Sequence, residues 1–208
     1  PAGYGIWFMG YFARGVFPAA TVERATNKES GLVDNSHLEM VARTIGVLMM
    51  QKLWPVEVER RTGRVSNCND NSATIGQIRK GRAKWGLAND CLLCTATLAL
   101  RSGVDIVEEG EDEWVASAEG IFGDSLSRSI GTNAKAEEGW QRFLIETGGR
   151  PTKEIRLKSD APFWSMQDAL AFANYDDFDV PPLPLDIVIF PTPAISHFRT
   201  LARPLMPP

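Results

Sequence analysis

Residues 4–18 read YGIWFMGYFARGVFP, and the fold of the chain begins with this stretch. Its side chains are mostly aromatic or apolar, and its glycines fall where an extended chain can bend. The pattern predicts two adjacent antiparallel strands joined by a tight turn near Gly10. This hairpin is the first step in the alternation of elements that assigns the fold class.

Outward from the hairpin, helical and β-prone stretches alternate. An apolar series at helical spacing predicts an amphipathic helix over residues 37–53: Leu38, Val41, Ile45, Leu48, Met49 and Leu53. Beyond it, the predicted elements are a strand over 64–69, a helix over 72–80 that ends at Gly81, a helix over 89–101, strands over 104–107 and 113–116, and a helix from 124 to 130. This order predicts an α/β fold, with a mixed sheet flanked by helices.

The character of the chain changes after residue 130. Residues 134–147 predict one more amphipathic helix, with Trp140, Phe143 and Leu144 inward and Gly148-Gly149 at its end. The segments PPLPLDIVIFPTP (181–193) and ARPLMPP (202–208) are rich in proline, which favours extended chain lying over a neighbouring surface. We therefore expect a domain over 1–130 and, over 131–208, a helical and then Pro-rich C-terminal extension that binds protein partners.

Composition limits the functions that the chain can have. Its 208 residues can bury a core, and no apolar run is long enough to cross a bilayer, so we expect no membrane partner. The net charge of −4 argues against a surface that binds phosphate everywhere, yet four cations cluster locally at Arg79, Lys80, Arg82 and Lys84. Three cysteines indicate an intracellular, reducing compartment, and the CxxC of Cys91 and Cys94 reads as core packing rather than zinc binding.

Three carboxylates follow three different elements, and each has a structural explanation of its own. Ser36 and Glu39 fit a capping box at the start of the first long helix. Asp70 can cap the helix that begins at Ser72, and Asp124 can cap one that begins at Ser125. Taken singly, all three carboxylates are explained as helix caps.

Taken together, the same carboxylates predict a metal site. A carboxylate in the first turn of a helix, one at a strand exit and one at the start of the last helix of an α/β fold can converge at one sheet edge. Such a group of hard oxygen ligands suits Mg²⁺, which binds few protein carboxylates and keeps water and phosphate oxygens. Two such ions can activate water and stabilise a leaving oxygen in phosphodiester cleavage.

Four stretches in this order resemble the ribonuclease H domain of retroelement reverse transcriptases, in particular those of DIRS-like, tyrosine-recombinase retrotransposons. They are GYGIWF (3–8), SHLEMVA (36–42), NDNSATIGQIRKGRAK (69–84) and EWVASAEGIFGDSLSR (113–128). The segment DIVIFPTPAISHFRTL (186–201) is similar to the one that follows ribonuclease H in those polyproteins. The resemblance implies a ribonuclease H-like sheet and Mg²⁺-dependent cleavage of RNA in RNA–DNA hybrids. It also implies that Glu39, Asp70 and Asp124 are catalytic metal ligands.

The chain departs from the family pattern at two places. In the family, the first catalytic Asp lies just before the first glycine pair. The corresponding position here would be immediately upstream of Pro1. Without that carboxylate, the repulsion between two bound metal ions is less well offset by negative ligands. We therefore expect little or no hydrolysis and at most one weakly held Mg²⁺. The loop before Asp124 also lacks a histidine that could shuttle protons, and we expect His37 to be a surface residue at a helix start.

Three functions therefore stay open. The first is a retroelement ribonuclease H, in which Asp70 binds metal while Arg79, Lys80, Arg82 and Lys84 contact nucleic-acid phosphates. The same four cations also suit a solvated helix end that the helix dipole favours. The second function is a non-catalytic, domesticated component of a ribonucleoprotein or another large assembly. The third is an inactive connection-like domain inside a working reverse transcriptase.

Overall fold

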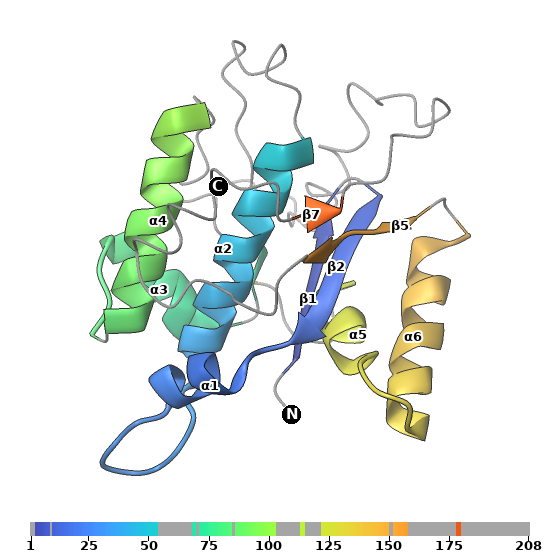
Figure 1. Ribbon diagram of the computed structural model, residues 1–208, viewed down its shortest axis with the longest axis horizontal. Coiled ribbons are helices and arrows are strands. Elements are labelled where there is room, and N and C mark those ends of the chain that lie inside the picture. The colour runs from blue at the N-terminus through green and yellow to red at the C-terminus, as the bar shows by residue number, and fades with distance from the viewer. Residues whose placement is uncertain are drawn as a thin grey trace, which may run out of the picture.

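The computed structural model describes residues 3–8, 10–53, 68–69, 71–84, 86–102, 113–114, 122–149, 152–157 and 178–179. The elements in chain order are β1 (Gly3–Phe8), β2 (Tyr11–Val16), α1 (Ala19–Ala25), α2 (Asn35–Leu53), β3 (Cys68–Asn69), α3 (Ser72–Lys80), α4 (Gly86–Ser102), β4 (Glu113–Trp114), α5 (Gly123–Arg128), α6 (Ala134–Thr147), β5 (Lys153–Glu154), β6 (Arg156–Leu157) and β7 (Phe178–Asp179) (Figure 1). Strands and helices alternate along the chain, and the α/β class predicted from the sequence is confirmed.

The predicted hairpin is present and forms two of the three strands of a small mixed sheet. β1 and β2 pair antiparallel in a register that runs from Gly3 opposite Val16 to Phe8 opposite Tyr11. Gly10, at the turn, has a φ of 86°, a left-handed conformation that glycine adopts without penalty. On the other side of β2, β5 pairs parallel to it, so the strand order is β1-β2-β5. β3 and β4 form a separate parallel pair, and β6 and β7 form an antiparallel one.

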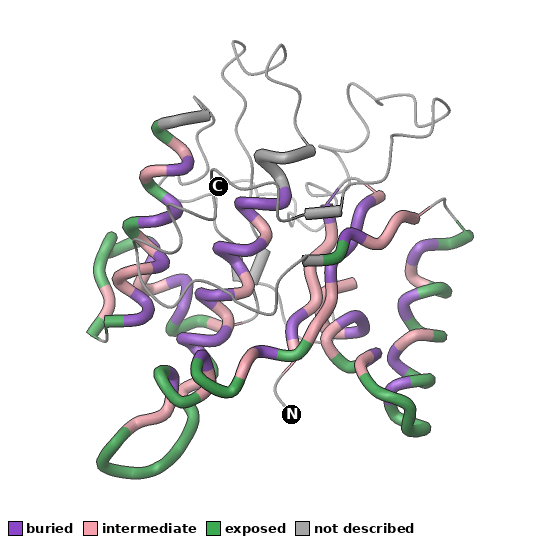
Figure 2. The backbone as a smooth tube through the Cα atoms, in the orientation of Figure 1, coloured by how far each residue is buried: buried purple, intermediate pink, exposed green. Residues whose placement is uncertain are grey.

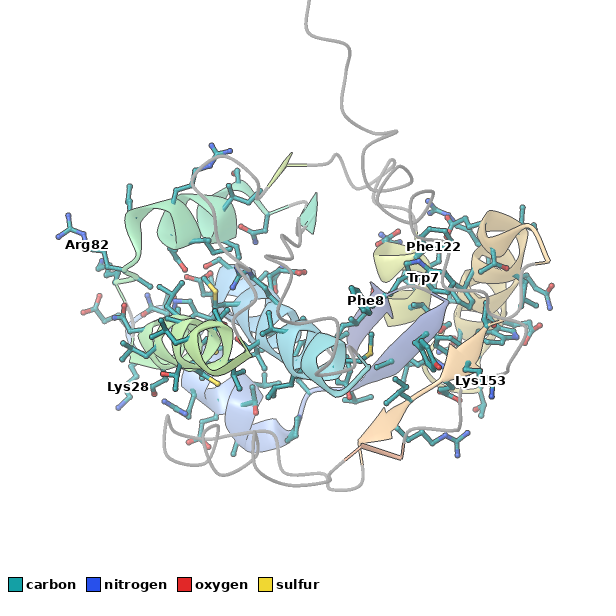
Figure 3. The ribbon with its side chains drawn as sticks, turned by 90° about the horizontal axis from the view of Figure 1, so that it is seen from above. Trp7, Phe8, Lys28, Arg82, Phe122 and Lys153 are labelled. Atoms are coloured by element: carbon teal, nitrogen blue, oxygen red, sulfur yellow. The ribbon has the colours of Figure 1, made fainter. Side chains whose placement is uncertain are left out.

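Helices cover both faces of the three-stranded sheet. Successive residues of a strand point to opposite faces, so Tyr4 and Phe8 of β1 enter the core shared with α2 and α4, whereas Trp7 joins α5 and α6. Figure 3 shows the sheet between these two groups of helices, with Trp7 beside Phe122. The molecule thus has three layers, helices–sheet–helices, with a hydrophobic core on each side of the sheet.

The α2–α4 side contains the larger core. α2 is buried along nearly all of its described length (Figure 2), because β1 covers one of its faces and α4 another. Cys91 and Cys94 of α4 are buried free thiols in this core, and burial raises the pKa of Cys91 to about 12. The prediction that the CxxC is a packing feature is confirmed.

Two glycines allow α5 to lie directly on β1. A Cβ atom on Gly5 would lie 2.4 Å from the carbonyl oxygen of Gly123 and 2.5 Å from the Cβ of Leu126. A Cβ on Gly3 would lie 2.7 Å from the carbonyl oxygen of Ser127. Only a strand without side chains at these two positions can accept the helix at this distance, which explains the spacing of glycines in GYGIWF.

The predicted helices are found with small changes at their ends. α3 and α6 begin and end where the sequence indicates, and α3 ends at Gly81 with a φ of 61°. α2 and α4 begin two and three residues earlier than predicted, at Asn35 and Gly86. Leu144 was predicted to point inward, and this prediction is wrong, because it is 39% exposed while its neighbour Phe143 is fully buried.

Several predicted segments lie outside the described residues. They include Asp70, the strand over 104–107, most of the strand over 64–69 and the Pro-rich segments from residue 181 onward. None of the helices in the described ranges is both long and apolar enough to span a bilayer.

Candidate metal and nucleic-acid site

Glu39 lies directly after the first turn of α2, which begins at Asn35, and is half-buried. The capping box predicted for Ser36 and Glu39 is wrong, because α2 starts at Asn35, two residues earlier than predicted, and Asp34 is its cap. One carboxylate oxygen of Asp34 accepts hydrogen bonds from the Ser36 N–H at 3.0 Å and from the Ser36 hydroxyl at 2.6 Å. Glu39 is therefore not the reciprocal partner that a capping box at Ser36 requires.

His37, beside Glu39, is buried rather than on the surface. Only 2% of the residue is exposed, and its Nε2 atom lies 3.9 Å from a carboxylate oxygen of Asp34. Burial lowers the pKa of His37, and the nearby negative charge of Asp34 opposes this shift in part. The prediction of a surface histidine is wrong because α2 is enclosed on several sides at its first turn.

The start of α3 is fixed by Asn71 and Thr74. The Asn71 side chain accepts hydrogen bonds from the N–H groups of Ala73 and Thr74, so it supplies the cap that the sequence interpretation gave to Asp70. The buried Thr74 hydroxyl donates to the carbonyl oxygen of Ser36 at 3.0 Å. The first turn of α3 is thereby joined to the first turn of α2, which directly precedes Glu39.

Asp124 lies in the first turn of α5, and both of its carboxylate oxygens accept hydrogen bonds from arginines. Oδ1 accepts from Nε of Arg128 at 2.8 Å, and Oδ2 lies 3.4 Å from Nη1 of Arg142 on α6. The Asp124 side chain is only 17% exposed. The interpretation of Asp124 as the cap of a helix starting at Ser125 is wrong, because α5 starts at Gly123 and no side-chain cap comes from its own N-cap residue.

Glu146 of α6 supplies the missing acceptor at the start of α5. Its Oε2 atom accepts the N–H of Phe122 at 3.0 Å and the hydroxyl of Ser125 at 2.7 Å, while Oε1 accepts Nε of Arg142 at 2.8 Å. Phe122 has a φ of 74°, which costs a residue with a side chain roughly 1–2 kcal/mol. The bond to Glu146 and the stacking of its ring on Trp7, with centroids 4.6 Å apart, hold this conformation.

Two of the three predicted metal ligands, Glu39 and Asp124, are among the described residues, and their helices pack on opposite faces of the sheet. Glu39 is on α2 and Asp124 on α5, so they can share a site only at an edge of the sheet. In the described ranges, no three His, Cys, Asp or Glu side chains gather closely enough to hold a metal ion. Because Asp70 lies outside those ranges, the three-carboxylate site stays a prediction. Its carboxylate oxygens fit Mg²⁺ in type, and binding at Asp124 requires that its arginine partners yield.

The four cations of the predicted nucleic-acid edge lie at the opposite end of α3 from its cap. Arg79 and Lys80 are in its last turn, Arg82 and Lys84 follow Gly81, and all four are exposed. In Figure 3, Arg82 points outward at the edge of the molecule.

The loop that carries Arg82 and Lys84 is held in place. The Asn89 side chain accepts the N–H of Ala83 at 2.7 Å and donates to its carbonyl oxygen at 2.8 Å. Along α3, the basic end lies about 12 Å from the helix start, given the rise of 1.5 Å per residue. The basic end is thus presented on a fixed turn, at the opposite end of α3 from Asn71.

Sequence reasoning missed Arg142 and Glu146. Their spacing of four residues on a helix is visible in the sequence as an ion-pair signal. What the sequence does not contain is their contact with α5, which joins residues 18 and 24 positions apart. Comparison of the chain with family models, with curated proteins and with solved structures finds no match.

Proposed function

We propose that the chain is a ribonuclease H-like, retroelement-derived domain that contacts nucleic acid. In this proposal, Glu39, Asp70 and Asp124 are the Mg²⁺ ligands of ancestral RNA cleavage in RNA–DNA hybrids. The observation that carries the proposal is the buried bond from Thr74 to Ser36, which joins the helix start of Glu39 to that of the helix directly after Asp70. The close packing of α5 on β1 supports the assignment of Asp124, because α2 packs on the other face of the same strand.

In this proposal, the basic and the acidic residues have different roles. The exposed cations at the end of α3 neutralise backbone phosphates and position the duplex without reading its sequence. The three carboxylates hold the cation, which when bound activates water and stabilises the leaving oxygen. Nothing in this division requires a specific base sequence, so we expect affinity for hybrids of any sequence.

The nucleic-acid contact is tested by fluorescence anisotropy with a short labelled RNA–DNA hybrid at several salt concentrations. We expect Arg82→Gln to weaken binding and to lower the slope of log K against log salt by about one, since one phosphate contact is lost. Lys28→Gln is the matched control, because Lys28 is also exposed but lies in the turn after α1. Equal effects of the two substitutions would contradict the assignment of the basic end.

The metal site is tested by calorimetric titration of Mg²⁺ and by hybrid cleavage. We expect the chain to bind Mg²⁺ weakly, and Asp70→Asn or Glu39→Gln to reduce that binding further. Any Mg²⁺-dependent cleavage of the hybrid should vanish in Asp70→Asn. Full cleavage by that variant would exclude this mechanism.

A non-catalytic component of a ribonucleoprotein is the second candidate, and the state of Asp124 favours it. Both of its oxygens accept hydrogen bonds from guanidinium groups, which compete with a cation for the same carboxylate. This candidate predicts binding of hybrid or structural RNA with no cleavage at any Mg²⁺ concentration. It also predicts protein partners on the Pro-rich extension, so removal of residues 181–208 should abolish co-purification of a partner and leave RNA affinity unchanged.

A further inference from the structure

The ion-pair network between α5 and α6 contains two basic and two acidic side chains. Arg128 and Arg142 share the carboxylate of Asp124, and Arg142 also binds Glu146. The four formal charges cancel, so the network is neutral as it stands. Glu146 is fixed by the N–H of Phe122 and the hydroxyl of Ser125, and it therefore holds Arg142 in a set position.

Both guanidinium groups keep hydrogen-bond donors that bond to no acceptor among the described residues. A guanidinium has five N–H donors in a planar fork. Among the described residues, Arg128 donates only through Nε, and Arg142 only through Nε and Nη1. The side chains of Arg128 and Arg142 are 67% and 43% exposed, respectively, so the remaining donors are accessible from solvent.

We propose that Arg128 and Arg142 form a phosphate-binding site, and that Asp124 occupies this site in the free protein. Carboxylate and phosphate oxygens match the same guanidinium fork, so one can replace the other. The weaker of the two contacts, 3.4 Å from Arg142 to Asp124, is the one that opens first. The identification of the phosphate as nucleic-acid backbone rests on the proposed function, whereas the phosphate site itself does not.

The exchange couples phosphate binding to the availability of Asp124. When a phosphate takes the two arginines, the Asp124 carboxylate loses its partners and becomes free to bind a cation. When a cation holds Asp124, the negative charge of that carboxylate is neutralised, so less negative charge faces the two guanidinium groups and they attract phosphate more strongly. Each ligand therefore strengthens the binding of the other by the same factor.

The test is phosphate and hybrid affinity in the presence of EDTA, which removes any contribution of metal. We expect Arg128→Gln and Arg142→Gln to weaken binding of the labelled hybrid roughly tenfold each, the loss typical of a charge-assisted hydrogen bond. Asp124→Asn removes the internal competitor, and we expect it to tighten binding by about threefold to tenfold. The affinity for inorganic phosphate, measured by competition and by calorimetry, should change in the same directions. It should fall in Arg128→Gln and Arg142→Gln and rise in Asp124→Asn.

Controls separate this exchange from a structural ion pair. Arg156→Gln removes an exposed arginine that pairs with Glu154 on the sheet, and it should leave both affinities unchanged. Thermal unfolding of each variant checks that the fold is kept. If Asp124→Asn weakens binding as Arg128→Gln does, or if neither changes it, the phosphate site is overturned.

The outcomes also distinguish this inference from the proposed function. Hybrid binding that depends on Arg82 but not on Arg128, Arg142 or Asp124 would remove the phosphate site and keep the nucleic-acid function. Suppose instead that the affinity for inorganic phosphate changes in the expected directions but no variant binds the hybrid. This result would support the phosphate site and contradict the nucleic-acid function.

Discussion

The two faces of the three-stranded sheet are built in different ways. On the α2–α4 face, the helices are separated from the strands by large side chains, and the core consists mainly of aliphatic residues, with two buried thiols. On the α5–α6 face, a short helix touches the strand backbone at glycines, and the core is a small aromatic cluster around Phe143. The charged network of Asp124 and Glu146 borders this second face.

The difference indicates a division of roles. A core of large side chains can absorb small changes by repacking, because side chains can change rotamer. A backbone in contact with a backbone cannot, so the α5 face fixes the position of Asp124 within narrow limits. We therefore expect the α5–α6 face to be the less tolerant of substitution, although it buries less apolar surface.

The largest expected effect is that of Gly5→Ala. The added Cβ would lie within 2.5 Å of Gly123, Leu126 and Ser127, and two of these contacts are to backbone atoms. We expect the free energy of unfolding to fall by at least about 3 kcal/mol, measured by urea denaturation. A loss below about 1 kcal/mol would show that α5 does not lie on β1 at this distance, and the contrast between the two faces would disappear.

Glu146→Ala should have the next largest effect. It removes the acceptor of the Phe122 N–H and of the Ser125 hydroxyl, so we expect a loss of about 1–3 kcal/mol in unfolding free energy. Glu137→Ala is the control in the same helix, because Glu137 is exposed and its side chain bonds, within the described part of the chain, only to Gln141. The control should change stability by less than about 0.5 kcal/mol. Similar losses in the two variants would mean that Glu146 does not hold the start of α5.

A pH effect is expected from the other face, at His37. Burial lowers its pKa in the folded protein, so the unfolded chain binds a proton first as the pH falls. The stability is present in full above the ordinary histidine pKa of about 6.5 and decreases as the pH falls through it, by at most about 1.4 kcal/mol per pH unit. Urea denaturation at several pH values between neutral and mildly acidic gives the dependence of the unfolding free energy on pH. The unfolding free energy of His37→Gln should change less with pH than that of the wild-type chain. Equal slopes would contradict a neutral, buried histidine.

Local signals in the sequence predicted most of the elements but few of their contacts. The hairpin, α2, α3 and α6 follow from alternation, periodicity and the terminal glycines Gly81 and Gly148, which all act within a few residues. The cap of α3 was assigned to Asp70 although Asn71, one residue later, provides it, because both residue types can cap a helix. Periodicity identifies the apolar face of a helix but not how much of that face the neighbouring elements cover. For this reason Leu144 was wrongly placed inward.

The site was less predictable because it depends on contacts between distant segments. Asp124 was identified from its motif, but the arginine and glutamate that hold its helix come from α6. The burial of His37 depends on how α1, α3 and α4 enclose α2, which no window of sequence contains. Residue type and local spacing thus selected a candidate, and the tertiary packing decided its partners.

Gly76→Ala, on the α2–α4 side, should have the smallest effect, and in the opposite direction to that of Gly5→Ala. Gly76 is in the interior of α3, and among the described residues a Cβ added there meets no atom of a neighbouring element within 4 Å. Alanine restricts the unfolded chain and favours the helix, so we expect a gain of roughly 0.5–1 kcal/mol in unfolding free energy. The same urea denaturation measures both substitutions. If Gly76→Ala were also destabilising, the cost at Gly5 could not be assigned to the contact with α5, because glycine would then be required for a reason common to both positions.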